Sequence, residues 1–143
     1  MRIERVLQDK GDEVITIGPD AKVGEAVKLL SERRMGAVIV SDGDGLPAGI
    51  LSERDVVREL GRSGPGVLEQ TVAEMMTSEL THCAPADTLD QVLTKMTEGR
   101  FRHMPVMREG EMVGLISIGD VVKARLSELA MERDALEGMV MGH

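Results

Sequence analysis

Residues 49–57 read GILSERDVV, and residues 114–122 read GLISIGDVV. Each stretch is typical of a strand that runs directly into a helix, because apolar residues lead into a Ser and an acidic residue follows three positions later. A chain of 143 residues that carries one nine-residue pattern twice indicates an internal repeat. The rest of the chain should therefore divide into two similar units.

The similarity extends far beyond these two stretches. A shift of 66 residues superposes two apolar sets, each with the i, i+3, i+4, i+7 spacing of one helix face. These sets are Val23, Ala26, Val27 and Leu30 in the first copy, and Leu89, Val92, Leu93 and Met96 in the second. The shift falls to 65 at the quoted motif, because the first copy has one more loop residue.

Each copy predicts the order strand, helix, strand, turn, strand, helix. The turns are expected at residues 42–45 and 108–111, where glycine has acidic neighbours. One such unit leaves a sheet face uncovered, so we expect an α/β (α+β) fold in which the two units pack sheet to sheet with pseudo-two-fold symmetry. The predicted division is residues 1–60 for the first repeat with its preceding segment, 61–70 for a linker, 71–127 for the second repeat, and 128–143 for a C-terminal helical extension.

Composition excludes several classes of partner. A formal net charge of −8 argues against nucleic acid and against anionic membrane surfaces, both of which reward surplus Lys and Arg. Cys83 is the only cysteine, so an internal disulfide cannot form. The N-terminal residues lack the apolar core of a signal peptide, and a cytoplasmic protein is the expectation.

The repeated motif Gly-x-x-Ser-x-x-Asp has two readings. In the first, Ser52 and Ser117 cap helices, and Asp55 and Asp120 complete a capping box. In the second, the helix N-terminus and the Ser hydroxyl hold a phosphate while the Asp accepts hydrogen bonds from ribose hydroxyls. The motif glycines would let a second backbone or a flat ligand approach. Both readings use the same geometry.

The duplicated pattern resembles a pair of CBS domains, also called a Bateman module, over roughly residues 1 to 128. The motif residues 49–55 and 114–120 carry the resemblance, together with the apolar-Pro-Val strand Met104-Pro105-Val106. The first copy departs from that strand pattern with Val38-Ile39-Val40. The resemblance implies a non-catalytic regulatory module that binds an adenine nucleotide such as AMP, ADP, ATP or NAD in clefts between the two repeats.

The resemblance also implies site residues. For one cleft they are Ser117, Asp120, His103, Met104, Thr81 and His82. For the other they are Ser52, Asp55, Ala37, Val38, Thr16 and Ile17. In this scheme the Asp holds ribose, the Ser lies near phosphate, and the residues before the Pro-Val strand line the base.

The two predicted clefts are not equivalent. Arg102 and His103 lie near the second motif, whereas Gly36 and Ala37 take their places in the first copy. We therefore expect tighter adenosine binding at the second motif. Arg54 lies inside the first motif and is expected to reach a phosphate.

Catalytic and metal sites are not expected. Asp42-Gly43-Asp44-Gly45 superficially resembles a calcium loop, but the EF-hand spacing places Pro47 where glycine is required. His82 and Cys83 are adjacent and would point to opposite faces of a strand, so a nucleophile and base pair is not expected there.

The segment from Val121 to Val140 predicts an amphipathic helix longer than the repeat requires, with Arg133 interrupting its apolar residues. The helix could pack on its own module or pair with a second subunit. By resemblance a homodimer is expected, and an effector protein could also receive the signal in trans. The alternative function is a ligand-free interaction module acting through this helix. A small nucleotide hydrolase is disfavoured, because too few acids, bases and metal ligands converge.

Overall fold

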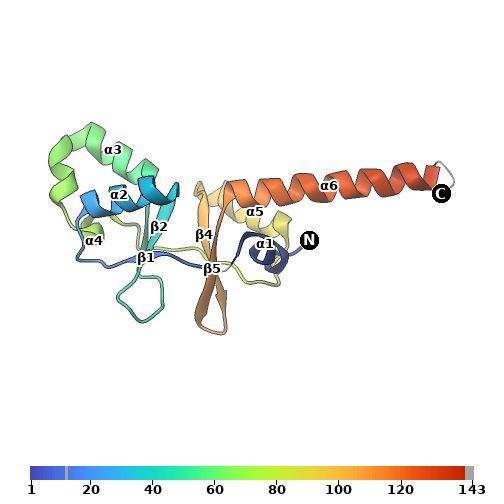
Figure 1. The fold of residues 1–143 in the computed structure, drawn as a ribbon, viewed down its shortest axis with the longest axis horizontal. Helices are drawn as coiled ribbons and strands as arrows, with labels where there is room; N and C mark the ends of the chain where they lie inside the picture. Colours follow the sequence, from blue (N-terminus) through green and yellow to red (C-terminus); the bar gives the residue numbers. More distant parts are fainter. Residues whose placement is uncertain (12, 141–143) are drawn as a thin grey trace. The chain divides into compact units, whose positions relative to one another are not determined.

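The computed structural model describes residues 1–11 and 13–140, so the last three residues of the expected C-terminal extension lie outside the described part. The chain has a mixed α/β composition of short strands and helices (Figure 1). In order, the elements are α1 (Ile3–Lys10), β1 (Thr16–Ile17), α2 (Val23–Arg33), β2 (Ala37–Val40), β3 (Gly49–Ser52), α3 (Glu53–Ser63), the 3-10 helix η1 (Pro65–Glu69), α4 (Val72–Met75), α5 (Leu89–Gly99), β4 (His103–Arg108), β5 (Glu111–Ser117) and α6 (Ile118–Val140). Among the described residues, no helix is long and apolar enough to cross a membrane.

The chain forms two compact units that do not follow chain order. Unit 1 contains residues 1–11, 82–108 and 113–140, whereas unit 2 contains residues 13–81 and 109–112. The helix that precedes the first repeat, α1, thus belongs with the elements of the second repeat. The helix that precedes the second repeat, α4, belongs with the elements of the first.

Unit 2 is built on a three-stranded sheet of order β1-β2-β3. Strand β2 is parallel to β1, with Thr16 opposite Ile39, and antiparallel to β3, with Ala37 opposite Ser52. All four residues of β2 are buried, which is typical of a central strand. Helices α2 and α4 cover this sheet with aliphatic side chains, and Val23, Val38, Leu51 and Val72 are among the core residues.

Unit 1 contains most of the β4–β5 hairpin. The hairpin turn is Glu109-Gly110, in which both residues have a positive φ, as the tight turn predicted here requires. The opening strand expected for the second repeat is reduced to one parallel bridge between Cys83 and Val106. Pro85 follows this bridge closely, and because proline has no N–H it cannot extend the ladder.

The motif glycines are sites of close helix packing. A Cβ atom built on Gly114 would lie 2.5 Å from Leu7 Cδ2 of α1. A Cβ atom on Gly49 would lie 2.9 Å from the backbone oxygen of Thr77, which follows α4 and is hydrogen-bonded to Ile50. Gly49 therefore admits the backbone that follows α4, as anticipated from the sequence, whereas Gly114 admits the Leu7 side chain of α1.

The stretch 61–70, which the sequence suggests as a linker, is helical in unit 2. Residues 61–63 form the last turn of α3, and η1 follows with Val67 only 2 % exposed. Gly64 adopts φ +80° between the two helices, so the glycine-rich composition serves a sharp turn within packed structure.

Candidate functional site

The first motif forms a complete capping box at the start of α3. The Asp55 N–H donates to Ser52 Oγ at 3.2 Å, while the Ser52 N–H donates back to Asp55 Oδ2 at 3.0 Å. The Ser52 hydroxyl also donates to Oδ2 at 2.9 Å, and Arg58 donates to Oδ1 at 2.9 Å. Both carboxylate oxygens of Asp55 and the Ser52 hydroxyl are therefore engaged within α3 itself.

The second motif repeats the reciprocal bonds at the start of α6. The Asp120 N–H donates to Ser117 Oγ at 3.1 Å, and the Ser117 N–H donates to Asp120 Oδ2 at 2.8 Å. The cation is different, because Lys10 from α1 donates to Asp120 Oδ2 at 2.6 Å and to the backbone oxygen of Leu115 at 2.8 Å. The capping interpretation of the motif is therefore confirmed in both copies.

The motif carboxylates of Asp55 and Asp120 differ in their ion-pair partners and in their exposure. The hydrogen bonds from Lys10 and from the Ser117 N–H both end on Oδ2 of Asp120, and the Ser117 hydroxyl also donates to this carboxylate. Within residues 1–11 and 13–140, no cation pairs with Oδ1 of Asp120 as Arg58 does with Oδ1 of Asp55. The side chain of Asp120 is 26 % exposed, against 11 % for Asp55. The second motif thus leaves Oδ1 of its Asp without the ion-pair partner that Arg58 supplies in the first motif.

Electrostatics keeps Asp120 ionised. Burial of the carboxyl group raises its pKa, but the hydrogen bonds from Lys10 and from the Ser117 N–H, together with the charge of Lys10, outweigh burial. The net pKa of Asp120 is therefore lowered from its ordinary value of 3.8. At neutral pH this group is a carboxylate that can only accept hydrogen bonds.

Backbone pairing brings other predicted residues to the motifs. The Ile118 N–H donates to the Arg102 oxygen at 2.7 Å, so the residue before β4 lies beside the first turn of α6. The Glu53 N–H donates to the Gly36 oxygen at 2.9 Å in the equivalent place. Next along β4, His103 is half-buried and Met104 is fully buried, so Met104 belongs to the core of unit 1.

Residues predicted from the opening strands lie further from the motifs. Thr16 and Ile17 pair with Ile39 and Val40, and β2 separates them from Ser52 on β3. Two strand spacings amount to about 10 Å, so Thr16 and Ile17 are not direct neighbours of the first motif Ser. In the first copy Ala37, directly opposite Ser52, and Val38 are buried, while Arg54 is exposed. Thr81 and His82 are also exposed.

Cys83 is a buried free thiol. Burial and the charge of Asp87 raise its pKa to about 12, although Lys95 acts in the opposite direction. His82 is exposed and Cys83 is 2 % exposed, which agrees with the prediction that the two point to opposite faces. In the part of the chain that the structure describes, no group of three His, Cys, Asp or Glu side chains could hold a metal ion.

Lys10 is the site residue that the sequence did not single out. It is 110 positions from Asp120, and the repeat alignment gives it no counterpart beside Asp55. A basic residue at the end of a helix is ordinarily explained by the helix dipole. The position of Lys10 beside Asp120 depends on the packing of α1 against Gly114, which no local sequence pattern indicates.

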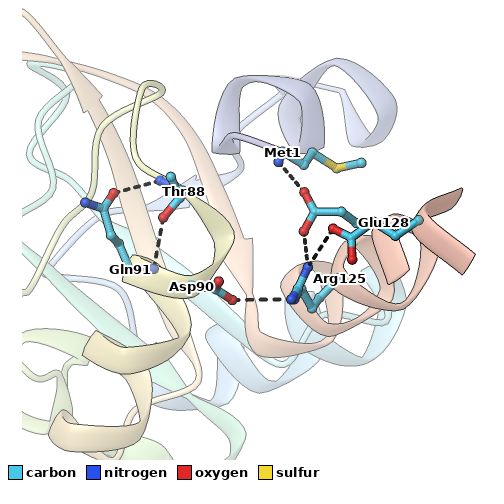
Figure 2. Close-up of polar contacts among 7 residues, drawn as sticks. Met1, Thr88, Asp90, Gln91, Arg125 and Glu128 are labelled. Carbon is cyan, nitrogen blue, oxygen red and sulfur yellow. Dashed lines mark hydrogen bonds and ion pairs between the residues drawn. The ribbon is translucent and has the colours of Figure 1, made fainter. Parts of the chain in front are cut away.

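A polar network fixes the start of α6 in unit 1 (Figure 2). Arg125 contacts Asp90 of α5 at 3.5 Å and also pairs with Glu128, which in turn contacts the amino group of Met1. In the same view Thr88 and Gln91 form the capping box of α5. The motif Ser117 and Asp120 therefore begin a helix that is held by both α1 and α5.

Comparison with known sequences decides the family. The sequence profile of the CBS domain matches residues 10–62 and 72–127, which together make up most of the chain. The chain belongs to the CBS-domain family. A mitochondrial CBS-domain protein of Arabidopsis thaliana, CBSX3, is 35 % identical over 127 residues, which cover 86 % of this chain. This CBS pair spans between 23 % and 62 % of the length of the first curated relatives it matches.

Solved CBS-domain structures share the fold. The CBS-domain protein ATU1752 from Agrobacterium tumefaciens is 45 % identical, with a TM-score of 0.85 over 87 % of this chain and 99 % of that one. The CBS domain pair of MJ0100, solved in complex with 5′-methylthioadenosine and S-adenosyl-L-methionine, is 20 % identical, with a TM-score of 0.78 over 90 % and 98 % of the two chains. The predicted α/β (α+β) fold of a tandem CBS pair is therefore confirmed.

Proposed function

We propose that this chain is a regulatory module without catalytic activity that binds an adenosine compound of the AMP, ADP, ATP or NAD class. The output acts through another chain, either a second copy or an effector protein. The proposal rests on the chemistry of the second motif and is supported by the adenosine ligands of the MJ0100 complex.

The observation that carries the proposal is Oδ1 of Asp120, which has no ion-pair partner among the described residues. A ribose hydroxyl needs an ionised acceptor, and Oδ1 of Asp120 provides one in a group whose pKa is lowered. A phosphate oxygen needs donors, and the Ser117 hydroxyl and the positive end of α6 provide them. Arg102, anchored beside Ile118, adds a local cation to a protein of net charge −8.

The second motif should bind more tightly than the first. A ligand at Oδ1 of Asp55 must displace Arg58, whereas a ligand at Oδ1 of Asp120 displaces no cation of the described residues. Each hydrogen bond exchanged in this way costs on the order of 1 kcal/mol, or about fivefold in affinity. Filling of the second motif before the first is therefore the expected order.

Thermal unfolding with AMP, ADP, ATP, NAD, S-adenosylmethionine and GTP tests the proposal. A ligand at about 100 times its dissociation constant should stabilise the fold by roughly 2.7 kcal/mol. Asp120→Asn should abolish most of the shift and Asp55→Asn less of it. Asp90→Asn, which makes the same change in the first turn of α5, is the matched control and should leave the shift intact.

Other outcomes would contradict the proposed function. If none of the six compounds raises the midpoint of the wild type, the motif Ser and Asp act only as helix caps and the proposal is wrong. The alternative, a ligand-free interaction module, is favoured by one observation, which is the exposed apolar face of α6. A small hydrolase would instead release phosphate or nicotinamide from these nucleotides in a steady-state assay.

A further inference from the structure

Lys10 is the last residue of α1, and its ammonium group lies on the carboxylate of the second motif. It donates to Asp120 Oδ2 at 2.6 Å and to the backbone oxygen of Leu115 at 2.8 Å. The side chain of Lys10 is 39 % exposed, and that of Asp120 is 26 % exposed. The ion pair is therefore accessible to solvent and to a small ligand.

Oxygen Oδ2 of Asp120 has no room for a further donor. A carboxylate oxygen offers about two lone pairs. The Ser117 N–H and the Lys10 ammonium both donate to Oδ2, at 2.8 Å and 2.6 Å. A third donor must therefore replace one of them. The Ser117 N–H is fixed in the backbone at the start of α6, whereas Lys10 ends a flexible side chain, so Lys10 is the donor that is exchanged.

The number of ribose hydroxyls decides whether this exchange is needed. A single hydroxyl can donate to Oδ1 of Asp120, which has no ion-pair partner among the described residues. The two neighbouring hydroxyls of a 2′,3′-diol match the two oxygens of one carboxylate, with one hydroxyl on each oxygen. A diol held in this way needs Oδ2 as well as Oδ1, and it therefore competes with Lys10.

Lys10 is also the polar anchor of the last turn of α1. Residues 8–11 are exposed, and the buried residues of this helix are Ile3, Val6 and Leu7. Among the described residues, Lys10 is the only member of 8–11 whose hydrogen bonds or ion pairs reach an element other than α1. Without Lys10, this turn is held by bonds within the helix, such as that from the Gly11 N–H to the Leu7 oxygen at 2.8 Å.

The chain leaves unit 1 at this turn. Residues 1–11 belong to unit 1, and unit 2 begins at residue 13. Helix ends with few buried contacts are the parts of a protein that open most readily. Displacement of Lys10 therefore loosens the segment by which the chain passes from unit 1 to unit 2.

We propose that Lys10 competes with the ligand of the second motif, and that a ribose diol bound to Asp120 displaces Lys10 and releases the last turn of α1. The inference rests on the proposed function, because it requires an adenosine compound at Asp120. A ligand shifts a conformational equilibrium only by its differential affinity for the two states. Here the second ribose hydroxyl supplies that difference.

The first motif lacks this coupling. Arg58 pairs with Oδ1 of Asp55 at 2.9 Å, and both residues belong to α3. Displacing Arg58 would therefore release no other element. Of the two copies, only the second joins its carboxylate to a helix from the other end of the chain.

Calorimetric titration with AMP and 2′-deoxy-AMP tests the competition. Both ligands carry the same phosphate, so the loss of one cation affects them equally, and the ratio of their dissociation constants isolates the second hydroxyl. Lys10→Met should raise the preference for AMP over 2′-deoxy-AMP by about fivefold, which corresponds to the loss of a partly exposed ion pair.

Two further variants serve as controls. Arg5→Met removes one cation from the same helix, and the Arg5 side chain pairs only with Asp9 at 3.4 Å, so this variant should keep the wild-type ratio. Lys10→Arg retains the cation beside Asp120 and should also stay close to the wild-type ratio.

Hydrogen exchange measures the release of the helix end. Saturating AMP should speed exchange of the Gly11 amide in the wild type, whereas 2′-deoxy-AMP should not. In Lys10→Met the same amide should exchange faster without ligand, and AMP should add no further change.

Three results would overturn the inference. An unchanged or smaller preference for AMP in Lys10→Met would exclude the competition while leaving the proposed function intact. Slower exchange of the Gly11 amide with AMP would exclude the release. If neither the wild type nor Lys10→Met binds AMP, the competition is also excluded, and the thermal screen with the other five compounds decides the proposed function separately.

Discussion

Lys10 holds the carboxylate of Asp120 across 110 residues of chain, with Nζ 2.6 Å from Oδ2. The equivalent carboxylate, Asp55, is instead paired with Arg58 three residues further along its own helix. The second motif is therefore tied to α1 by an ion pair, and the first is satisfied locally. This difference makes the two copies of one motif chemically distinct.

The ion pair predicts a pH dependence of stability. The pKa of Asp120 is lowered in the folded protein, so its contribution is fully present above the unfolded pKa of about 3.9 and is lost as pH falls through the folded pKa. Asp120→Asn should thus destabilise the protein at pH 7, and the difference from the wild type should shrink as pH falls below about 4 and through the lowered pKa of folded Asp120. Urea unfolding at stepped pH measures both.

Lys10→Met should reduce the same pH dependence and cost up to about 1 kcal/mol at pH 7, because the pair is partly exposed. Lys28→Met is the control, since Lys28 pairs only with Glu32 at 4.0 Å on the surface of α2. An equal loss of pH dependence in both variants would contradict the role assigned to Lys10.

Arg54 should contribute to phosphate binding. It is exposed, and no described residue forms an ion pair with it. Arg54→Gln is expected to weaken ATP or NAD more than adenosine, because only the first two bring phosphates to a cation. Isothermal titration with the three ligands measures the difference. Arg62→Gln at the other end of α3 is the control, and equal losses for all three ligands would exclude a phosphate contact.

The two motif glycines should respond unequally to a methyl group. Gly49→Ala places Cβ 2.9 Å from the Thr77 backbone oxygen, which cannot move without breaking its bridge to Ile50, whereas Gly114→Ala meets the end of the flexible Leu7 side chain. Overpacking of this kind costs about 1–3 kcal/mol, with Gly49→Ala the larger.

Chemical denaturation of both glycine variants gives the comparison. Leu7→Ala should partly rescue Gly114→Ala by removing the clashing atoms, and it should not rescue Gly49→Ala. Equal destabilisation of the two alanine variants with no rescue would show that backbone freedom, and not close packing, explains the glycines.

Cys83 should be inert in the folded protein. Its pKa of about 12 leaves almost no thiolate at pH 8, and the side chain is buried. An aromatic disulfide reagent should react with it at least about a hundredfold more slowly than with an exposed thiol. Cys83→Ala/Ala86→Cys supplies that reference three residues away, and labelling of Cys83 should match it only in denaturant.

The repeat, its element order and the capping residues could be predicted because they depend on local sequence. The 66-residue shift identified the apolar faces of α2 and α5, and Ser52 and Ser117 marked the starts of α3 and α6. The turn at Glu109-Gly110 followed from its glycine in the same way.

Long-range packing could not be predicted from those local patterns. The place of α1 beside Gly114, and hence the pair between Lys10 and Asp120, depends on contacts between segments more than 100 residues apart. The short opening strand at Cys83 also escaped prediction, because its apolar pattern does not reveal how many backbone bonds it makes. The site residues Thr16 and Ile17 were placed by resemblance, and β2 separates them from Ser52.

Helices α1 and α4 each belong with the elements of the other repeat, and this arrangement also predicts the order in which the two units fold. Most of unit 2 is one continuous stretch, residues 13–81, whereas unit 1 must bring residues 1–11 back to residues 82 onward. Bringing residues 1–11 to residues 82 onward closes a long loop, which costs conformational entropy. If residues 13–81 are already folded, the effective length of that loop is shorter. We therefore expect residues 13–81 to become structured first, with α1 left as an unpaired arm. Folding is then completed when Leu7 of α1 packs on Gly114 of β5.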